Sequence, residues 1–195
     1  MHGRSRWRQV PGLGENVAMG SLLIVTGPPG AGKSTVAKLL ADSTSRSVLV
    51  AGDAFFGFLA NGAIDPWLPE SHEQNTVVTR AAGKATGEFV AGGFAVVYDG
   101  MIGPWFLDTF VTMAGLTEVD YAVLLPTVEV CQQRVAARHG HGFTDIPATA
   151  SMHRQFSEAE LEQRHLIRDH GQTPSETADS IRHALSTGTL RRAAH

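Results

Sequence analysis

The sequence predicts an α/β fold in which a parallel β-sheet is covered by helices on both faces. Short apolar runs alternate with longer segments of helical periodicity along most of the 195 residues, and this alternation is typical of parallel sheets. A loop rich in Gly and Pro follows the first apolar run, and two later runs end in Asp. Ligands of such sheets bind outside the carboxyl ends of the strands, so we expect these polar groups along one edge.

The first strand and the first helix flank the Gly-rich loop in the stretch IVTGPPGAGKSTVAKLL. Residues 21–26 (SLLIVT) form a short apolar run of the kind that makes a buried strand. Val36, Leu39 and Leu40 lie at helical spacing and share one face of a helix that begins near Lys33. The loop is therefore expected between the end of a strand and the start of a helix.

The loop has the spacing of a phosphate-binding loop: Gly27, four residues, then Gly32, Lys33 and Ser34. Glycines allow the backbone to turn its N–H groups inward, and the following helix adds the positive end of its dipole. Lys33 can reach the β- and γ-phosphates of a nucleotide, and Ser34 can ligate Mg²⁺. The predicted nucleotide-binding residues are Gly27, Pro28, Pro29, Gly30, Ala31, Gly32, Lys33, Ser34 and Thr35. An ordinary Gly/Pro turn is the alternative, but the strand before it and the helix after it favour nucleotide binding.

The second predicted strand, residues 47–53 (SVLVAGD), ends in Asp53. A carboxylate beside a transferable phosphate can accept the proton of a substrate hydroxyl, so Asp53 is a candidate catalytic and substrate-binding residue. Capping of a helix or turn is the alternative role for this Asp. We favour the catalytic role, because the chain offers no other obvious base near the loop.

The Gly- and Pro-rich stretch after Asp53 has no clean period but holds several aromatic residues. Phe55, Phe56 and Trp67 can form a mobile wall over an acceptor substrate, or they can pack in an ordinary core. A helix over about residues 70–91 follows, and Arg80 within it can contact a polar or anionic acceptor, although a helix-face Arg is more often solvated. The predicted apolar face of this helix carries Val77, Ala81, Ala85 and Phe89, with Val78 and Ala82 beside them.

The third predicted strand, residues 94–100 (FAVVYDG), places Asp99 at its end. An Asp after an apolar run is the pattern of the second acidic motif of phosphate-loop proteins, whose carboxylate holds Mg²⁺ directly or through water. A turn-capping Asp is the alternative, and we favour the metal role, together with Ser34. Pro104 then stands at a plausible first position of the next helix.

A fourth strand over residues 120–125 leads into a helix over residues 128–140, on which Arg134 and Arg138 share one face. Near a γ-phosphate these arginines can neutralise the charge of the transfer state, although a basic helix end also complements the helix dipole. The Gly-rich HGHGFTD stretch has the composition of a closing lid, which we expect over about residues 138–150.

The remaining elements are a polar helix, a weak edge strand and a clearly capped last helix. The predicted ranges are residues 150–164 for the polar helix and 165–171 for the strand. Thr173, Pro174 and Glu176 form a capping box with Pro at the first helical position, and Gly188 ends that helix.

The composition of the whole chain argues against a nucleic-acid-binding protein, a membrane-spanning protein and a disulfide-bonded protein. The net charge is −3 and both signs are mixed, so no nucleic-acid footprint is evident, and no apolar run approaches the ~18 residues of a membrane span. A single cysteine, Cys131, excludes an intramolecular disulfide and makes a cytoplasmic location the default expectation. Residues 1–19 read as a flexible leader ahead of one domain over residues 20–195.

The motifs TGPPGAGKST, AGD, VVYDG and QQRVAAR occur in the order used by small phosphate-loop kinases. Over about residues 21–186, the chain resembles the shikimate, gluconate and adenylate kinase-like proteins, and it is particularly similar to chloramphenicol phosphotransferase-like and tunicamycin-resistance-like proteins. The resemblance implies a P-loop NTPase fold with a five-stranded parallel sheet in the order 2-3-1-4-5. It also implies a helical acceptor region, over about residues 54–92 here, an Arg-bearing lid, ATP and Mg²⁺.

By the same resemblance, Asp53 matches the Asp that binds the acceptor hydroxyl and acts as base, and Arg138 and Arg134 match the lid arginines. One departure concerns the acceptor: adenylate kinase-like proteins have an Arg shortly after the DG of the third strand, whereas here the sequence continues as the apolar DGMIGPWF. This difference disfavours a nucleotide acceptor.

We therefore expect an ATP-dependent phosphotransferase acting on a hydroxyl of an antibiotic, nucleoside or sugar-like small molecule. The resemblance to antibiotic-linked proteins suggests a role in antibiotic resistance. An alternative is a resistance protein that binds ATP and a hydrophobic drug without transfer. A nucleoside or nucleotide kinase is a third alternative, and the sequence leaves open whether the base is Asp53 or a water held by Asp99.

Overall fold

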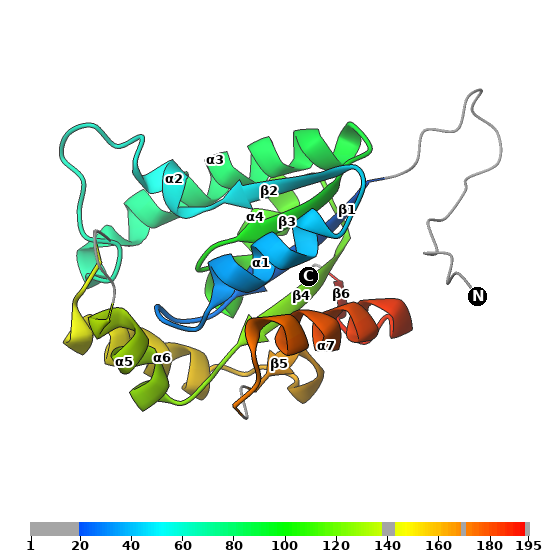
Figure 1. Ribbon diagram of the computed structural model, residues 1–195. Helices are drawn as coiled ribbons and strands as arrows, with labels where there is room; N and C mark the ends of the chain where they lie inside the picture. Colours follow the sequence, from blue (N-terminus) through cyan, green and yellow to red (C-terminus); the bar gives the residue numbers. More distant parts are fainter. Residues whose placement is uncertain (1–19, 138–142, 169–170, 194–195) are drawn as a thin grey trace, which may run out of the picture.

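A central parallel β-sheet organises the protein, and helices cover both of its faces (Figure 1). The computed structural model describes residues 20–137, 143–168 and 171–193. The five parallel strands follow the order β2-β3-β1-β4-β5, as expected, and an additional short strand, β6, pairs antiparallel with the start of β4. The strands are β1 (Ser21–Thr26), β2 (Ser47–Ala51), β3 (Ala95–Asp99), β4 (Glu118–Leu124), β5 (Leu166–Ile167) and β6 (Arg191–Ala193). The helices are α1 (Lys33–Asp42), α2 (Asp53–Phe56), α3 (His72–Ala91), α4 (Pro104–Met113), α5 (Val128–Ala136), α6 (Ile146–Glu158) and α7 (Pro174–Thr187), with 3₁₀ turns at Pro69–Ser71 and Gln163–His165.

The central strand β1 is buried from both sides because its side chains alternate between two apolar clusters. Leu22 and Ile24 belong to the cluster that includes residues of α3 and α4. Leu23 and Val25 belong to the cluster that includes residues of α1 and α7. A strand enclosed by helices on both faces needs an uninterrupted apolar run, and the sequence SLLIVT supplies it.

The buried face of α3 overlaps the predicted one only in part, because Val78 and Ala82 are buried as expected but other predicted members are not. Val77 and Phe89, expected on the apolar face, are 63% and 41% exposed. The buried side instead carries Gly83 and Gly87, where an added Cβ would lie 2.7 Å and 2.3 Å from backbone oxygens of the α4 segment. Close contact of the two helix backbones requires small residues at that position, so the packed side of α3 is the side that carries the two glycines.

The helix α6 begins earlier and ends earlier than predicted. Asp145 caps it by accepting a hydrogen bond from the backbone N–H of Ala148 at 2.7 Å, and Pro147 occupies its first turn. An Asp followed two residues later by Pro is a recognisable helix start, and it lies inside the stretch expected as a lid loop. The helix ends at Glu158, before the 3₁₀ turn.

The last helix, α7, begins and ends as predicted. The Thr173 hydroxyl and the Glu176 side chain form the reciprocal capping box, and Gly188 ends the helix with φ at 71°. The predicted leader, residues 1–19, and the first part of the lid, residues 138–142, lie outside the described residues. Within the described ranges, no helix has the length and apolarity needed to cross a membrane.

His165 is a fully buried histidine under the edge of the sheet. Its Nδ1 donates to the carbonyl oxygen of Tyr121 at 3.0 Å, whereas its Nε2 has no hydrogen-bond partner and lies 3.9 Å from Oε1 of Glu162. Burial is the main cause that lowers the pKa of His165; Arg164 and Arg192 lower it further, while the Tyr121 carbonyl and Glu162 oppose the shift.

We expect the free energy of unfolding to fall as the pH drops below about 6.5. The unfolded histidine binds a proton near that pH, while the lowered pKa of the folded one delays protonation to a lower pH, so the unfolded state binds more protons in between. The slope is at most about 1.4 kcal/mol per pH unit. Urea titrations between pH 7.5 and 5 check it. The variant H165Q should lose this dependence of the free energy of unfolding on pH. The control variant H183Q, which replaces an exposed histidine, should retain it. Equal pH dependence in the two variants would contradict the assignment of the effect to His165.

Candidate active site

Two glycines of the loop between β1 and α1 combine a positive φ angle with a close approach to neighbouring backbone. Gly27 and Gly30 have φ values of 140° and 81°. An added Cβ at Gly27 would lie 2.2 Å from the carbonyl oxygen of Leu124, and one at Gly30 would lie 2.3 Å from that of Cys131. The end of β4 and the helix α5 therefore contact the loop directly and fix its shape.

Lys33 and the start of α1 give this loop its positive character. Gly32 precedes the helix with φ at 93°, no acidic residue stands in the first turn, and Nζ of Lys33 donates to the carbonyl oxygen of Pro28 at 3.1 Å. Ser34 and Thr35 are exposed in the first turn. Free N–H groups at a helix N-terminus next to a lysine ammonium attract phosphate.

Asp99 lies at the end of β3, next to the loop. The nearby Ser34 side chain and the positive charge of Lys33 both act to lower the pKa of its carboxylate. Burial nevertheless raises the pKa of Asp99, and the charge of Asp53 raises it further. A carboxylate and a hydroxyl oxygen side by side are hard donors suited to Mg²⁺, so Ser34 and Asp99 fit the ion that the phosphate loop implies.

The variant D99N is expected to weaken Mg²⁺ binding without lowering the stability of the fold. Its Mg²⁺ requirement should rise about 10- to 100-fold, while its melting temperature without ligand should stay the same or increase, because a half-buried carboxylate with a raised pKa disfavours the folded state. Activity against Mg²⁺ concentration and a thermal melt measure the two effects. A lower melting temperature with an unchanged Mg²⁺ requirement would show that Asp99 only stabilises the strand end.

Asp53 stands beside Asp99 because the ends of β2 and β3 are joined. The strand β2 ends at Ala51, earlier than predicted, and Asp53 begins the short helix α2. The backbone N–H of Gly52 donates to the carbonyl oxygen of Asp99 at 2.7 Å, and a Cβ on Gly52 would lie 2.4 Å from the Tyr98 hydroxyl. Burial, followed by the charges of Asp53 and Asp99, raises the pKa of Tyr98, so this phenol stays neutral.

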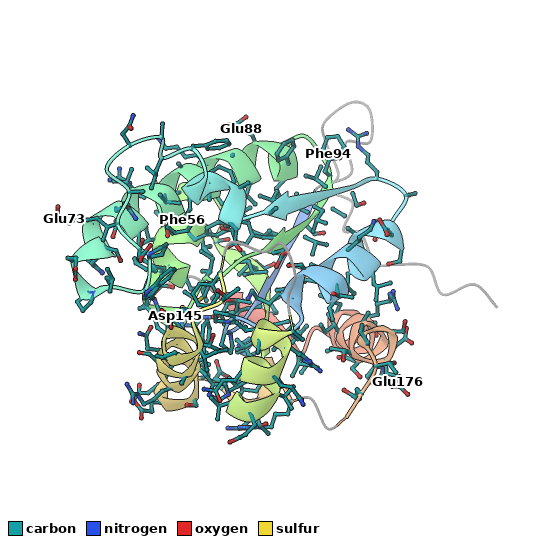
Figure 2. The ribbon with its side chains drawn as sticks, turned by 60° about the vertical axis from the view of Figure 1, so that its left-hand side comes forward. Phe56, Glu73, Glu88, Phe94, Asp145 and Glu176 are labelled. Carbon is teal, nitrogen blue, oxygen red and sulfur yellow. The ribbon has the colours of Figure 1, made fainter. Side chains whose placement is uncertain are left out.

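A cavity of about 780 Å³ opens from these polar groups. Lys33, Ser34 and Asp53 line one part of it, and aromatic and apolar side chains line much of the rest. The aromatic lining residues are Phe56, Trp67, Tyr98, Trp105, Phe106 and Phe143. Figure 2 shows Phe56 on the side of the molecule that carries α2 and α3, with Asp145 at the start of α6 below it.

The predicted acceptor residues divide into two groups. Phe56 and Trp67 line the cavity. Phe55 packs against the core and contacts Phe58 with ring centroids 5.6 Å apart, and Arg80 is exposed on α3 outside the lining. The structure does not bring Phe55 and Arg80 to the site, because the short helix α2 turns Phe55 inward and α3 packs on its opposite side.

Other lining residues were not identified from the sequence. Trp105 and Phe106 line the cavity and belong to the apolar segment MIGPWF after β3. The sequence shows that this segment lacks Arg, but not that it forms a cavity wall. The backbone of that segment is held by two buried hydroxyls: Thr26 accepts from the N–H of Ile102 at 3.0 Å, and Tyr121 donates to its carbonyl oxygen at 2.8 Å. A strand residue with a hydroxyl in an apolar run is the pattern that could have indicated this anchor.

Arg134 extends from α5 to the phosphate loop. Its Nη1 lies 3.5 Å from the carbonyl oxygen of Gly30. A Cβ added to Gly32 would lie 3.8 Å from the same Nη1 atom. A guanidinium at this point lies beside a loop built for phosphate. Arg138, the other predicted lid arginine, lies outside the described residues.

Comparisons with known proteins agree with this arrangement. The profile of the AAA domain family matches residues 22–161. A cytidylate kinase from Archaeoglobus fulgidus is 26% identical over 136 residues, which cover 69% of this chain and 71% of that protein. The structure of the Deinococcus radiodurans tunicamycin resistance protein has a TM-score of 0.64 at 16% identity, covering 85% of this chain and 95% of that one. A gluconokinase from Sinorhizobium meliloti 1021 has a TM-score of 0.61 at 20% identity, covering 88% and 94%.

The family match spans the phosphate loop, the two aspartates and the cavity wall up to the end of α6. The structures of the tunicamycin resistance protein and the gluconokinase share the fold of this chain. The chain therefore belongs to the AAA domain family and has the fold of a P-loop kinase.

Proposed function

We propose that this protein is an ATP-dependent phosphotransferase that moves the γ-phosphoryl group of ATP to a hydroxyl of a small molecule. The observation that carries the proposal is one cavity that joins Lys33, Ser34 and Asp53 to a large aromatic wall. The first part suits a nucleotide's phosphates, and the second suits the body of an acceptor. Antibiotics, nucleosides and sugar-like molecules are the acceptor types to test.

In the proposed reaction, the acceptor oxygen forms a bond to the γ-phosphorus while the bond from that phosphorus to the departing ADP oxygen breaks. The carboxylate of Asp53 orients the acceptor hydroxyl and takes its proton. Lys33 and Arg134 stabilise the charge on the transferred group. Mg²⁺, held by Ser34 and Asp99, would neutralise the phosphate oxygens when bound.

The cavity wall favours an acceptor without a phosphate of its own. Lys33 is the only Lys or Arg among the described lining residues, and it belongs to the phosphate loop. A nucleoside monophosphate would bring a dianion next to Met101 and Ile102, which occupy the segment after β3. Burial of an unpaired charge is strongly unfavourable, so a nucleotide kinase is a weaker candidate for this chain.

Mass spectrometry of the protein with Mg²⁺-ATP and a pooled library of hydroxylated antibiotics, nucleosides and sugars tests the proposal. We expect a product heavier by one phosphoryl group, formed over many turnovers and lost in D53N. Stoichiometric retention of a library compound without any product would contradict phosphotransfer and indicate a protein that sequesters its ligand. A phosphorylated nucleotide as the main product would contradict the acceptor class.

A further inference from the structure

We propose that the acceptor is a cationic alcohol, with an apolar ring-bearing body and a protonated amine that Glu158 binds. This inference rests on the proposed function, because it assigns the substrate class of the same cavity. It depends on three features of the described wall: its aromatic faces, the location of its cationic and anionic side chains, and the end of the helix α6.

The aromatic faces come from three segments that are far apart in sequence. Trp67 and Phe143 contact each other with ring centroids 5.0 Å apart, which joins the segment before α3 to the segment before α6. Trp105, in the first turn of α4, lies against Phe156 of α6 at 5.2 Å and remains 42% exposed. Aromatic faces that stay open to a cavity suit an apolar ring, and they also attract cations.

The charges of the wall are unevenly distributed. The ammonium group of Lys33 is bound to the phosphate loop through the Pro28 carbonyl oxygen. The carboxylates among the described lining residues are Asp53 and Glu158. Apart from the phosphate loop, the described wall offers two carboxylates and the ring of His72 but no Lys or Arg, which favours a cationic acceptor over a carboxylate or phosphate.

Glu158 is the last residue of α6, and Ala159 after it also lines the cavity. No basic residue stands in the last turn of the helix, and no Lys or Arg among the described residues forms an ion pair with Glu158. The carbonyl groups at a helix C-terminus carry partial negative charge. The Glu158 carboxylate at this end adds to that negative charge instead of balancing it. A bound ammonium group would interact favourably with both the carboxylate and the terminal carbonyl groups.

Three small alcohols with the same phenyl ring test the charge preference. They are 2-amino-1-phenylethanol, its neutral N-acetyl derivative, and the carboxylate mandelate. Binding is measured by tryptophan fluorescence with Mg²⁺ and a non-hydrolysable ATP analogue present, since Trp67 and Trp105 line the cavity. We expect the amine to bind roughly fivefold more tightly than the neutral compound, and mandelate to bind most weakly.

The variants E158Q and E160Q test whether the charge of Glu158 causes the preference for the amine over the neutral compound. Glu160 is an exposed glutamate two residues further along that does not line the cavity, so E160Q should retain the preference. E158Q should bind the amine and the neutral compound equally, with the neutral affinity unchanged. Added salt should weaken amine binding to the wild type, but not to E158Q.

The outcomes separate this inference from the proposed function. Equal or tighter binding of the neutral compound or mandelate to the wild type, no binding of the amine, or equal effects of E158Q and E160Q would overturn the inference. Transfer to other alcohols would be unaffected by that result. Conversely, if the amine binds as expected but ATP yields no phosphorylated product from it or from the pooled library, the kinase proposal fails and a cation-binding cavity remains.

Discussion

Replacing Asp53 with Asn is expected to lower kcat by about 10²- to 10⁴-fold, while ATP binds as before. Asp53 lies in the first turn of α2 and lines the cavity together with Lys33 and Ser34 of the phosphate loop and with the aromatic residues of the wall. The amide of Asn has nearly the same shape but cannot take a proton from the acceptor hydroxyl. The fold should survive, because Asp53 is exposed and the contact between β2 and β3 uses the backbone of Gly52.

Steady-state kinetics and nucleotide binding by calorimetry measure the two effects of D53N. The matched control is D65N, which removes an exposed carboxylate from the same segment but outside the cavity lining. We expect D65N to keep wild-type turnover. Unchanged turnover in D53N would assign the base to another group, such as a water held by Asp99, and a loss of ATP binding would assign Asp53 to the nucleotide site.

Replacing Gly30 with Ala is expected to damage both the fold and the nucleotide site. The residue has φ at 81°, and the added Cβ would lie 2.3 Å from the carbonyl oxygen of Cys131. Left-handed backbone strain and overpacking together should lower the free energy of unfolding by about 3 kcal/mol. A displaced loop also loses N–H contacts to phosphate, and the loss of two should weaken ATP binding roughly a hundredfold.

The control for G30A is G62A, in the segment between α2 and α3. Gly62 also has a positive φ, 72°, but an added Cβ there would meet no atom within 4 Å. Its cost should be the backbone strain alone, about 1 kcal/mol, with ATP affinity unchanged. Urea denaturation and calorimetry of both variants isolate the contact with Cys131. Equal effects in the two variants would show that the close approach of the loop to α5 has no energetic importance.

The local features of the site were predictable from the sequence. The phosphate loop depends on glycines, a lysine and a hydroxyl at fixed spacing, and the structure places it between β1 and α1 as expected. The carboxyl ends of parallel strands meet at one edge of a sheet, so Asp53 and Asp99 could be expected beside the loop, and the structure brings them there. The strand order was predicted by resemblance to small phosphate-loop kinases and is confirmed.

The aromatic and apolar wall of the cavity was less predictable, because its members come from segments that meet only in the folded chain. Trp105, Phe143 and Glu158 have no common spacing and lie on three different elements or connecting segments. The local sequence around each of them indicates only an ordinary core or surface residue. Their common role in lining one cavity depends on how α4 and α6 pack around the end of the sheet.

The helix α3 shows the physical reason most clearly. Periodicity along the sequence reports how apolar each side of a helix is, whereas packing also depends on how closely two backbones can approach. Gly83 and Gly87 let the α4 segment approach on one side, so Val77 and Phe89 on the other side stay exposed and Arg80 points away from the cavity lining. The sequence by itself thus determined the phosphate loop, the order of the main elements and the acidic strand ends, since these follow from local patterns. Only the tertiary structure decided which helix faces enclose the cavity and which charges line it, because those depend on contacts between distant segments.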